Sequence, residues 1–143
     1  MVIMRRTVKV ISVMIVTAAF TMMSVTTYAQ QQKKGEPWTI PAEYKTMKNP
    51  VVSDATTLAA GKMAYDKNCA SCHGKLGKGD GPKGRMCKVF PGDFSGADFQ
   101  AYSEGTMFYQ TKSGRGEMPA YDKKVPDNDI WKMVIYMRSL KQQ

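Results

Sequence analysis

The stretch Cys69-Ala70-Ser71-Cys72-His73 decides how this sequence is interpreted. Two residues separate the thiols, which places them about one helical turn apart, and a histidine follows the second thiol directly. His73 is also the only histidine among the 143 residues. This spacing is that of an attachment site for c-type haem, in which both thiols add across the haem vinyl groups and the adjacent imidazole ligates the iron. The motif predicts one covalent haem c, bound by Cys69 and Cys72, with His73 as the proximal iron ligand.

The first 29 residues are typical of a secretory signal peptide. Three cations among the first nine residues precede an apolar run from 10 to 23, and Thr27-Tyr28-Ala29 has small residues at the positions that a signal peptidase reads. A retained membrane anchor is the weaker alternative, because ~14 apolar residues rise only ~21 Å as a helix, short of the ~30 Å hydrocarbon core. We expect cleavage after Ala29, export to the periplasm or an equivalent compartment, and no stable membrane anchor afterwards.

The mature chain is expected to be small and basic. Removing residues 1–29, with three cations and no acid, takes the formal net charge from +9 to +6. A basic surface speeds encounter with acidic partners in a salt-sensitive way, although simple solubility also explains the charge. No nucleic-acid-binding motif accompanies it, so we expect redox partner proteins with acidic docking surfaces and no nucleic acid. The lysines that flank the haem motif and are expected to form such a docking face are Lys75, Lys78, Lys83 and Lys88.

Residues 30–52 are expected to form an extended N-terminal arm. Three prolines between positions 37 and 50 argue against a helix, since proline lacks the amide hydrogen and its ring obstructs the preceding turn. Trp38 and Ile40 are expected to pack on the following domain, because a lone exposed tryptophan is unusual.

Residues 53–143 are expected to form one all-α domain. Ser53 or Asp54 can cap a first helix that runs to about Asn68, and five glycines then mark a loop from 74 to 84. No strand-like alternation is present.

Two more helices are expected in this domain. The first covers 104–111 with Met107 and Phe108 inward, and the last begins between 127 and 129. The apolar face of the last helix comprises Ile130, Trp131, Met133, Val134, Ile135, Met137 and Leu140.

From about Asp54 to Leu140 the chain resembles class I c-type cytochromes. The resemblance implies an all-α fold in which the first and last helices cross around one haem, and a single-electron carrier between exported redox partners rather than an enzyme. It also implies that Met118 is the distal iron ligand. The matching features are Gly61, Tyr65, Cys69-x-x-Cys72-His73-Gly74, Gly79-Asp80-Gly81-Pro82, Pro91-x-x-Phe94, Gly114-Arg115-Gly116-Glu117-Met118-Pro119, Trp131 and Tyr136. The crossing is expected between Gly61 and Tyr65 on one helix and Met133, Tyr136 and Met137 on the other.

Cys87 is the feature that fits the family pattern least, because it is left unpaired in an exported protein. Three alternatives stay open: a buried small side chain, a disulfide with a partner chain in a homodimer or heterodimer, or a thiolate that replaces Met118 as distal ligand, as in a rare group of class I cytochromes. The last would lower the potential and suit a haem subunit of a larger complex that binds NO or CO. A zinc site is disfavoured, since Cys72 and His73 are adjacent and export disfavours zinc thiolates.

Several supporting roles are also expected. The carbonyl oxygen of Pro82 or Pro91 is a candidate acceptor for the free ring nitrogen of His73. Candidate contacts to a haem propionate are Arg115, Lys112 and Tyr121. Most other methionines are expected in the core, namely Met47, Met63, Met107, Met133 and Met137.

Overall fold

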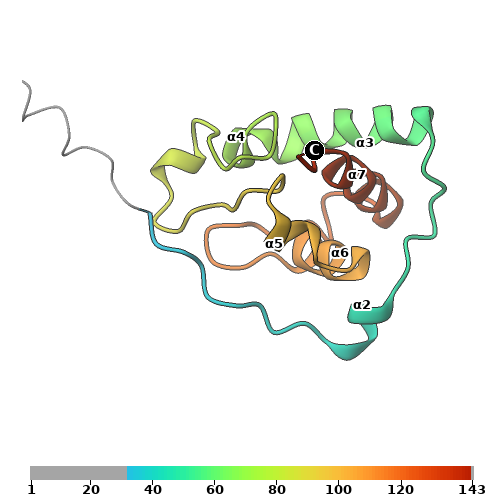
Figure 1. The fold of residues 1–143 in the computed structure, drawn as a ribbon, viewed down its shortest axis with the longest axis horizontal. Coiled ribbons are helices and arrows are strands. Elements are labelled where there is room, and N and C mark those ends of the chain that lie inside the picture. The colour runs from blue at the N-terminus through green and yellow to red at the C-terminus, as the bar shows by residue number, and fades with distance from the viewer. Residues whose placement is uncertain (1–31, 143) are drawn as a thin grey trace, which may run out of the picture. The chain divides into compact units, whose positions relative to one another are not determined.

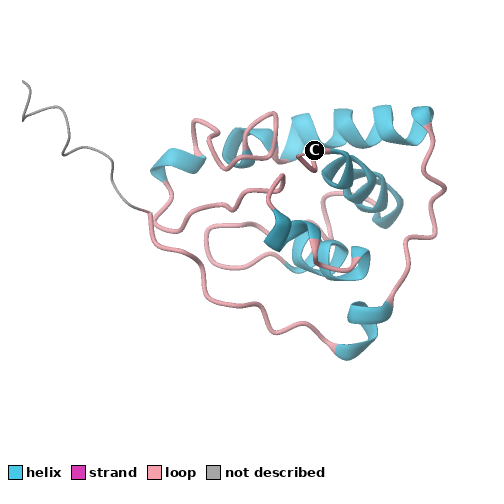
Figure 2. Cartoon of the chain, in the orientation of Figure 1, coloured by secondary structure: helices cyan, strands magenta, loops and turns pink. Residues whose placement is uncertain are grey.

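The computed structural model describes residues 32–142, and the predicted signal peptide lies outside them. Helices dominate this part of the chain, where pairing between extended segments is limited to two isolated bridges, Lys33 with Val89 and Arg115 with Met118 (Figure 2). No helix among the described residues is long and apolar enough to cross a membrane. The helices are α2 Ala42–Thr46, α3 Ala55–Asn68, α4 Ala70–His73, the 3₁₀ turn η1 Gly84–Met86, α5 Ala97–Gln100, α6 Glu104–Ser113 and α7 Asp127–Ser139 (Figure 1).

Helix α3 begins at a capping box. Asp54 accepts a hydrogen bond from the Thr57 amide at 2.8 Å, and the Thr57 hydroxyl accepts one from the Asp54 amide at 2.9 Å. These two bonds satisfy amides that the first helical turn leaves without intrahelical partners. The predicted helix start is confirmed, with Asp54 rather than Ser53 as the cap.

The crossing of α3 and α7 is the central contact of the domain. Gly61 is buried, and a Cβ atom there would overlap the carbonyl oxygen of Lys132, so only glycine lets the two backbones approach this closely. One turn later, the ring of Tyr65 lies 5.0 Å from that of Tyr136. The predicted crossing is therefore confirmed.

The core lies where α7 meets α3 and α6. Ile130, Met133 and Val134 are fully buried on α7, and Trp131 stacks on Phe108 of α6 with ring centroids 4.0 Å apart. Met107 is 1% exposed, as expected. Met63 on α3 was expected in the core, and that is wrong: it is 68% exposed, because it lies on the face of α3 opposite the buried Gly61 and Tyr65.

The described part of the arm contains a helix that the prolines were thought to exclude. Helix α2 fits between Pro41 and Pro50, because Pro41 precedes it with a φ of −58° that suits a helix start. Its Tyr44 ring lies 4.8 Å from the Tyr109 ring of α6, and farther along the arm the Asn49 side chain donates from Nδ2 to the Trp131 carbonyl at 3.0 Å. Figure 1 shows the arm following the outside of the domain to the start of α3.

Replacing Gly61 tests the crossing. Gly61→Ala is expected to destabilise the haem-loaded protein by about 1–3 kcal/mol, because the new methyl group forces α3 and α7 apart. Gly96→Ala is the matched control, since a Cβ there meets its nearest atom at 3.5 Å, an ordinary contact. Urea unfolding followed by circular dichroism measures both, and equal stability of the two variants would contradict this account of the crossing.

Tyr65 makes the stability of the domain depend on pH. Burial raises the pKa of Tyr65 above its ordinary value of 10.0, and its hydroxyl donates to the Gly74 carbonyl at 2.7 Å. Because the unfolded chain loses this proton more readily than the folded chain, the stability that Tyr65 contributes is complete below pH ~10 and falls as pH rises further.

We therefore expect Tyr65→Phe to cost about 1 kcal/mol at neutral pH and to flatten the alkaline fall in unfolding free energy. Unfolding at several alkaline pH values measures the slope. The same change at the exposed Tyr102 serves as control. A slope unaffected by Tyr65→Phe would show that other groups cause the alkaline loss.

Candidate functional site

The Cys69–His73 motif forms one helical turn. Cys69 is the C-terminal cap of α3, and its carbonyl oxygen accepts hydrogen bonds from the amides of Cys72 at 3.1 Å and His73 at 2.9 Å. Both thiols are half-buried and neither forms a disulfide. The turn therefore presents two free thiols and one imidazole from five consecutive residues.

His73 lies in an apolar environment. It is 8% exposed, and its ring stacks on Phe94 with centroids 4.4 Å apart, while Phe94 stacks on Phe99 at 4.3 Å. Burial lowers the pKa of His73 to about 4, so the ring is neutral at ordinary pH and a nitrogen lone pair is free to bind a metal.

The Nδ1 atom of His73 is buried, and the described residues offer it no hydrogen-bond partner. The expected bond to the carbonyl of Pro82 or Pro91 is thus not formed. Leaving a buried polar atom unpaired costs free energy, which only a group bound at Nδ1 itself would offset. A partly orphaned, neutral imidazole beside two free thiols fits a haem joined by two thioether bonds and one histidine ligand.

The glycine-rich loop that follows the motif is hydrogen-bonded to the backbone of the motif. The Gly79 amide donates to the His73 carbonyl at 2.8 Å, and the Lys83 amide donates to the Ser71 carbonyl at 2.9 Å. A Cβ at Gly81 would lie 2.5 Å from the Ser71 carbonyl oxygen, so the loop needs glycine to approach this closely. These contacts hold the backbone of the motif in one position relative to the loop.

Met118 lies in a tight turn between α6 and α7. The amides of Arg115 and Met118 each donate to the other residue's carbonyl, at 2.8 and 3.0 Å, and Gly116 between them has a φ of +59°. Met118 is half-buried. Just beyond the turn, the amides of Tyr121 and Asp122 donate to the Lys112 carbonyl at 3.0 and 3.1 Å. Backbone bonds therefore close the base of the loop, while side chains of the turn join it to other segments.

Cys87 directly follows η1 and is half-buried rather than fully buried. Its thiol donates to the Lys83 carbonyl at 3.5 Å, and its pKa is raised, first by burial and then by the charge of Glu117. Glu117 also accepts hydrogen bonds from the amides of Lys88 at 2.9 Å and Val89 at 3.3 Å. The two candidate distal ligands therefore lie on segments that are joined directly.

The three side chains expected near a propionate already have protein partners. Arg115 donates to the carbonyls of Glu36 and Pro37, and Lys112 pairs with Asp127 at 2.7 Å. The Tyr121 hydroxyl donates to the Asn68 carbonyl at 2.7 Å, and burial raises the Tyr121 pKa. Contacts with a propionate would have to replace or share these bonds.

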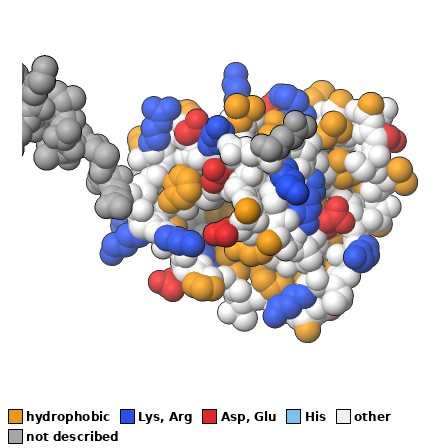
Figure 3. Space-filling view, in the orientation of Figure 1, with side chains coloured by type: hydrophobic (Ala, Val, Ile, Leu, Met, Phe, Trp, Pro, Cys, Tyr) orange, Lys and Arg blue, Asp and Glu red, His pale blue; other side chains and the backbone are white. Residues whose placement is uncertain are grey.

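The surface around the motif combines lysines with apolar side chains. Lys75, Lys78, Lys83 and Lys88 are all exposed, as expected. Leu76 is 63% exposed and Met86 is 78% exposed. On the face drawn in Figure 3, Lys and Arg side chains lie around apolar areas.

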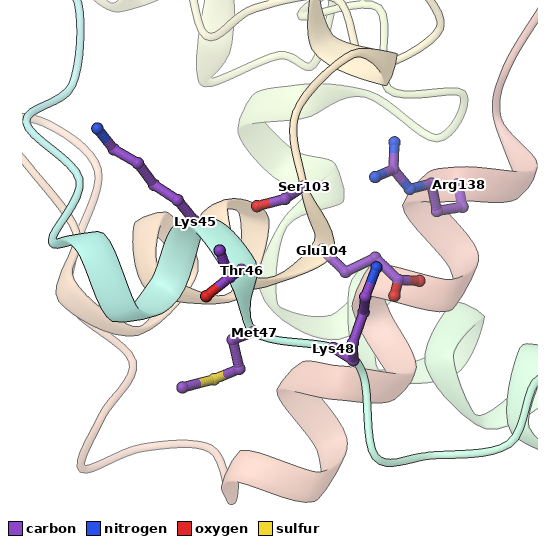
Figure 4. Close-up of a pocket in the computed structure, with 7 residues that line it drawn as sticks. All are labelled: Lys45, Thr46, Met47, Lys48, Ser103, Glu104 and Arg138. Carbon is purple, nitrogen blue, oxygen red and sulfur yellow. The ribbon is translucent and has the colours of Figure 1, made fainter.

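Two hollows lie apart from the expected iron ligands. One of about 580 Å³ is lined in the described part of the chain by Asp66, Ala70, Ser71, Gly74, Lys75, Leu76, Asp80, Gly81 and Pro82. The other, of about 230 Å³, is formed by α2 and the residues after it, the start of α6, and α7, and is lined by Lys45, Thr46, Met47, Lys48, Ser103, Glu104 and Arg138 (Figure 4). Neither lining includes His73, Met118 or Cys87.

Two residues near the site were not singled out from the sequence. Glu117 joins the turn of Met118 to the segment after Cys87, and Gln32 donates to the carbonyls of Gly84 and Cys87, both at 2.7 Å. Their partners are backbone groups more than 25 positions away, and no local pattern marks such contacts. Glu117 belongs to the matching stretch 114–119, but the resemblance to the family implied no role for it.

Comparison with known proteins places the domain in a family. The family model described as Cytochrome C oxidase, cbb3-type, subunit III matches residues 56–137, which is more than half of the chain. The chain belongs to this family. It is a monohaem class I c-type cytochrome with an all-α fold, its cofactor is covalently bound haem c, and it transfers electrons.

Individual relatives cover different shares of the chain. The cbb3-type cytochrome c oxidase subunit CcoP of Azospirillum brasilense is 32% identical over 100 residues, which is 69% of this chain and 34% of that subunit. Cytochrome c6 of Chlorolobion braunii is 31% identical over 80 residues, 56% of this chain and 86% of the relative. The chain thus spans about a third of the CcoP subunit.

A solved structure also matches. A chain of the reducing HAO-like protein complex of Kuenenia stuttgartiensis superposes with a TM-score of 0.58 at 26% identity, covering 77% of this chain and 52% of that one.

Proposed function

We propose that this cytochrome is a single-electron carrier whose haem is joined to Cys69 and Cys72, with His73 as proximal and Met118 as distal iron ligand. The observation that carries the proposal is the Cys69–His73 turn. One turn of helix presents two free thiols together with the only histidine of the sequence, which is buried, neutral and without a partner for Nδ1. When bound, haem c supplies a one-electron iron couple.

The chain's own residues would orient and tune that couple. The α4 turn and the Phe94 ring hold the His73 imidazole in one orientation. A thioether ligand from Met118 favours the reduced ion and raises the potential. The sequence has no second histidine to act as an acid or base, which supports a carrier rather than an enzyme.

The wider organisation is part of the same proposal. The chain would consist of a signal peptide at 1–29, an arm at 30–52 and a cytochrome domain at 53–143. The signal peptide would direct export to the periplasm or an equivalent compartment. There the exposed lysines and apolar side chains near the motif suit a redox partner with an acidic docking surface.

A second candidate function follows from Cys87. Its half-buried thiol lies on a segment that Glu117 joins to the turn of Met118, so it is the alternative distal ligand. Thiolate ligation would lower the potential and suit a subunit of a larger complex, homodimeric or heterodimeric, that binds NO or CO. We favour the methionine ligand because Met118 lies in a glycine-rich turn directly before Pro119, as the distal methionine of the family that the chain resembles does.

Absorption spectra of the oxidised and reduced haem-loaded protein distinguish the two ligands. We expect a methionine-to-iron charge-transfer band in the unsubstituted protein and in Cys87→Ala, and its loss in Met118→Ala together with a lower reduction potential. The exposed Met63→Ala is the control. A thiolate-type spectrum that disappears in Cys87→Ala would reject Met118 and support the second candidate.

The lysines are tested by electron transfer to small inorganic complexes. Changing Lys75, Lys78, Lys83 and Lys88 together to Gln should slow oxidation by an anionic complex such as hexacyanoferrate by about tenfold at low salt, and the difference should shrink as salt rises.

The control carries the same charge change at exposed lysines elsewhere, Lys45, Lys48, Lys67 and Lys123. Stopped-flow absorbance measures both variants. Equal rates in the two would place the electron-exchange face away from the haem motif.

A further inference from the structure

The segment 32–38 of the arm, here termed the strap, is tied to the residues around Cys87. Gln32 donates from Nε2 to the carbonyls of Gly84 and Cys87, each at 2.7 Å. The Phe90 amide donates to the Lys33 carbonyl at 3.0 Å, next to the bridge between Lys33 and Val89. The first residues of the strap therefore lie beside the 84–90 segment.

The other end of the strap is held by Arg115, which belongs to the turn of Met118. Its guanidinium donates from Nη1 to the Pro37 carbonyl at 3.0 Å and from Nη2 to the Glu36 carbonyl at 2.7 Å. The same group lies 4.3 Å from the centroid of the Trp38 ring. Two hydrogen bonds and one cation–π contact fix a single arginine, which a lysine could not reproduce.

A third connection completes the arrangement. Glu117, two residues after Arg115, accepts hydrogen bonds from the amides of Lys88 and Val89. The strap, the 84–90 segment and the Met118 turn are thus each bound to the other two. The Met118 turn is held from both sides, by Arg115 on the strap and by Glu117 on the 84–90 segment.

The turn itself provides little to fix its position. Gly114 and Gly116 both have positive φ, at +59°, and the internal hydrogen bonds only close the turn between Arg115 and Met118. A glycine just before a turn and another inside it allow the turn to change conformation when outside contacts are lost. A thioether is a weak iron ligand, so its occupancy depends on how firmly the turn is held.

We propose that Arg115 is a positioning residue that clamps the Met118 turn to the strap and so keeps the thioether on the iron. This role rests on Met118 being the distal ligand, as proposed above. Losing the clamp lets the turn open more often, and each opening exposes the distal side of the iron to exchange with an outside ligand.

The test compares haem-loaded Arg115→Ala with Arg85→Ala. Arg85 is also an exposed arginine that donates to a loop carbonyl, that of Asp80 at 3.1 Å, and among the described residues its side chain forms no hydrogen bond with the strap or the Met118 turn. Arg115→Lys keeps the charge without the two-pronged bond. Three quantities are measured: amide hydrogen exchange of residues 114–119, the rate of carbon monoxide binding to the reduced protein, and the methionine-to-iron band with the reduction potential.

For Arg115→Ala we expect exchange in 114–119 and carbon monoxide binding to be about tenfold faster, which corresponds to about 1.4 kcal/mol in the opening equilibrium. The band should weaken and the potential fall. Arg115→Lys should lie between Arg115→Ala and the unsubstituted protein, and Arg85→Ala should match the latter. If Arg115→Ala does not fold, Gln32→Ala, which frees the other end of the strap, should show the same changes to a smaller degree.

Two results would overturn the proposal, and they are distinguishable. Unchanged exchange and carbon monoxide binding in Arg115→Ala, with the band present, would reject the clamp and leave Met118 as ligand. A missing band in the unsubstituted protein would reject Met118, and the positioning role with it, whatever the exchange data show.

Discussion

The close approach of α3 and α7 at Gly61 is the constraint on which the rest of the domain depends. It fixes the direction of α3, whose last turn leads without interruption into Cys69, because the Cys69 amide donates to the Tyr65 carbonyl at 2.8 Å. The two tyrosines at the crossing also hold the chain beyond the motif. Tyr65 donates to the Gly74 carbonyl and Tyr136 to the Lys75 carbonyl, at 2.7 and 3.0 Å. The haem motif is thus anchored on both sides by the same helix pair.

The crossing accounts for the proximal side of the site but not for the distal side. His73 is placed by a helical turn, a buried aromatic stack and a glycine-rich loop that bonds to its backbone. Met118 and Cys87 lie on irregular segments, which hydrogen bonds to backbone groups and the Arg115–Trp38 contact join in the described part of the chain. Segments stabilised in this way open more readily than packed helices. The division suits a protein that must keep its haem permanently while the distal ligand determines its chemistry.

Sequence patterns predicted the elements that depend on local signals. Residues close together in the sequence encode the Asp54 cap, the apolar face of α7 and the order of the motifs, and the fold class was predicted from these features. Helix α2 was missed because the prediction considered the number of prolines in the arm and not the proline-free stretch between Pro41 and Pro50 in which the helix forms. The exposure of Met63 was missed because its helix offers apolar residues on more than one face, and only the partner helix decides which face is covered. The contacts of Arg115, Glu117 and Gln32 join distant backbone groups, and no periodicity encodes them.

The same ties bear on the choice between the two candidate ligands. Any movement of the 84–90 segment, which carries Cys87, relative to the turn that carries Met118 would have to break the contacts between them. Glu117 joins these segments directly, and the strap joins them a second time through Gln32 and Arg115. Moving either segment alone breaks hydrogen bonds to backbone groups, at a cost of about 1 kcal/mol for each bond that water does not replace. The contacts that hold the Met118 turn therefore also hold the segment that carries Cys87, and separating them requires the three segments to come apart together.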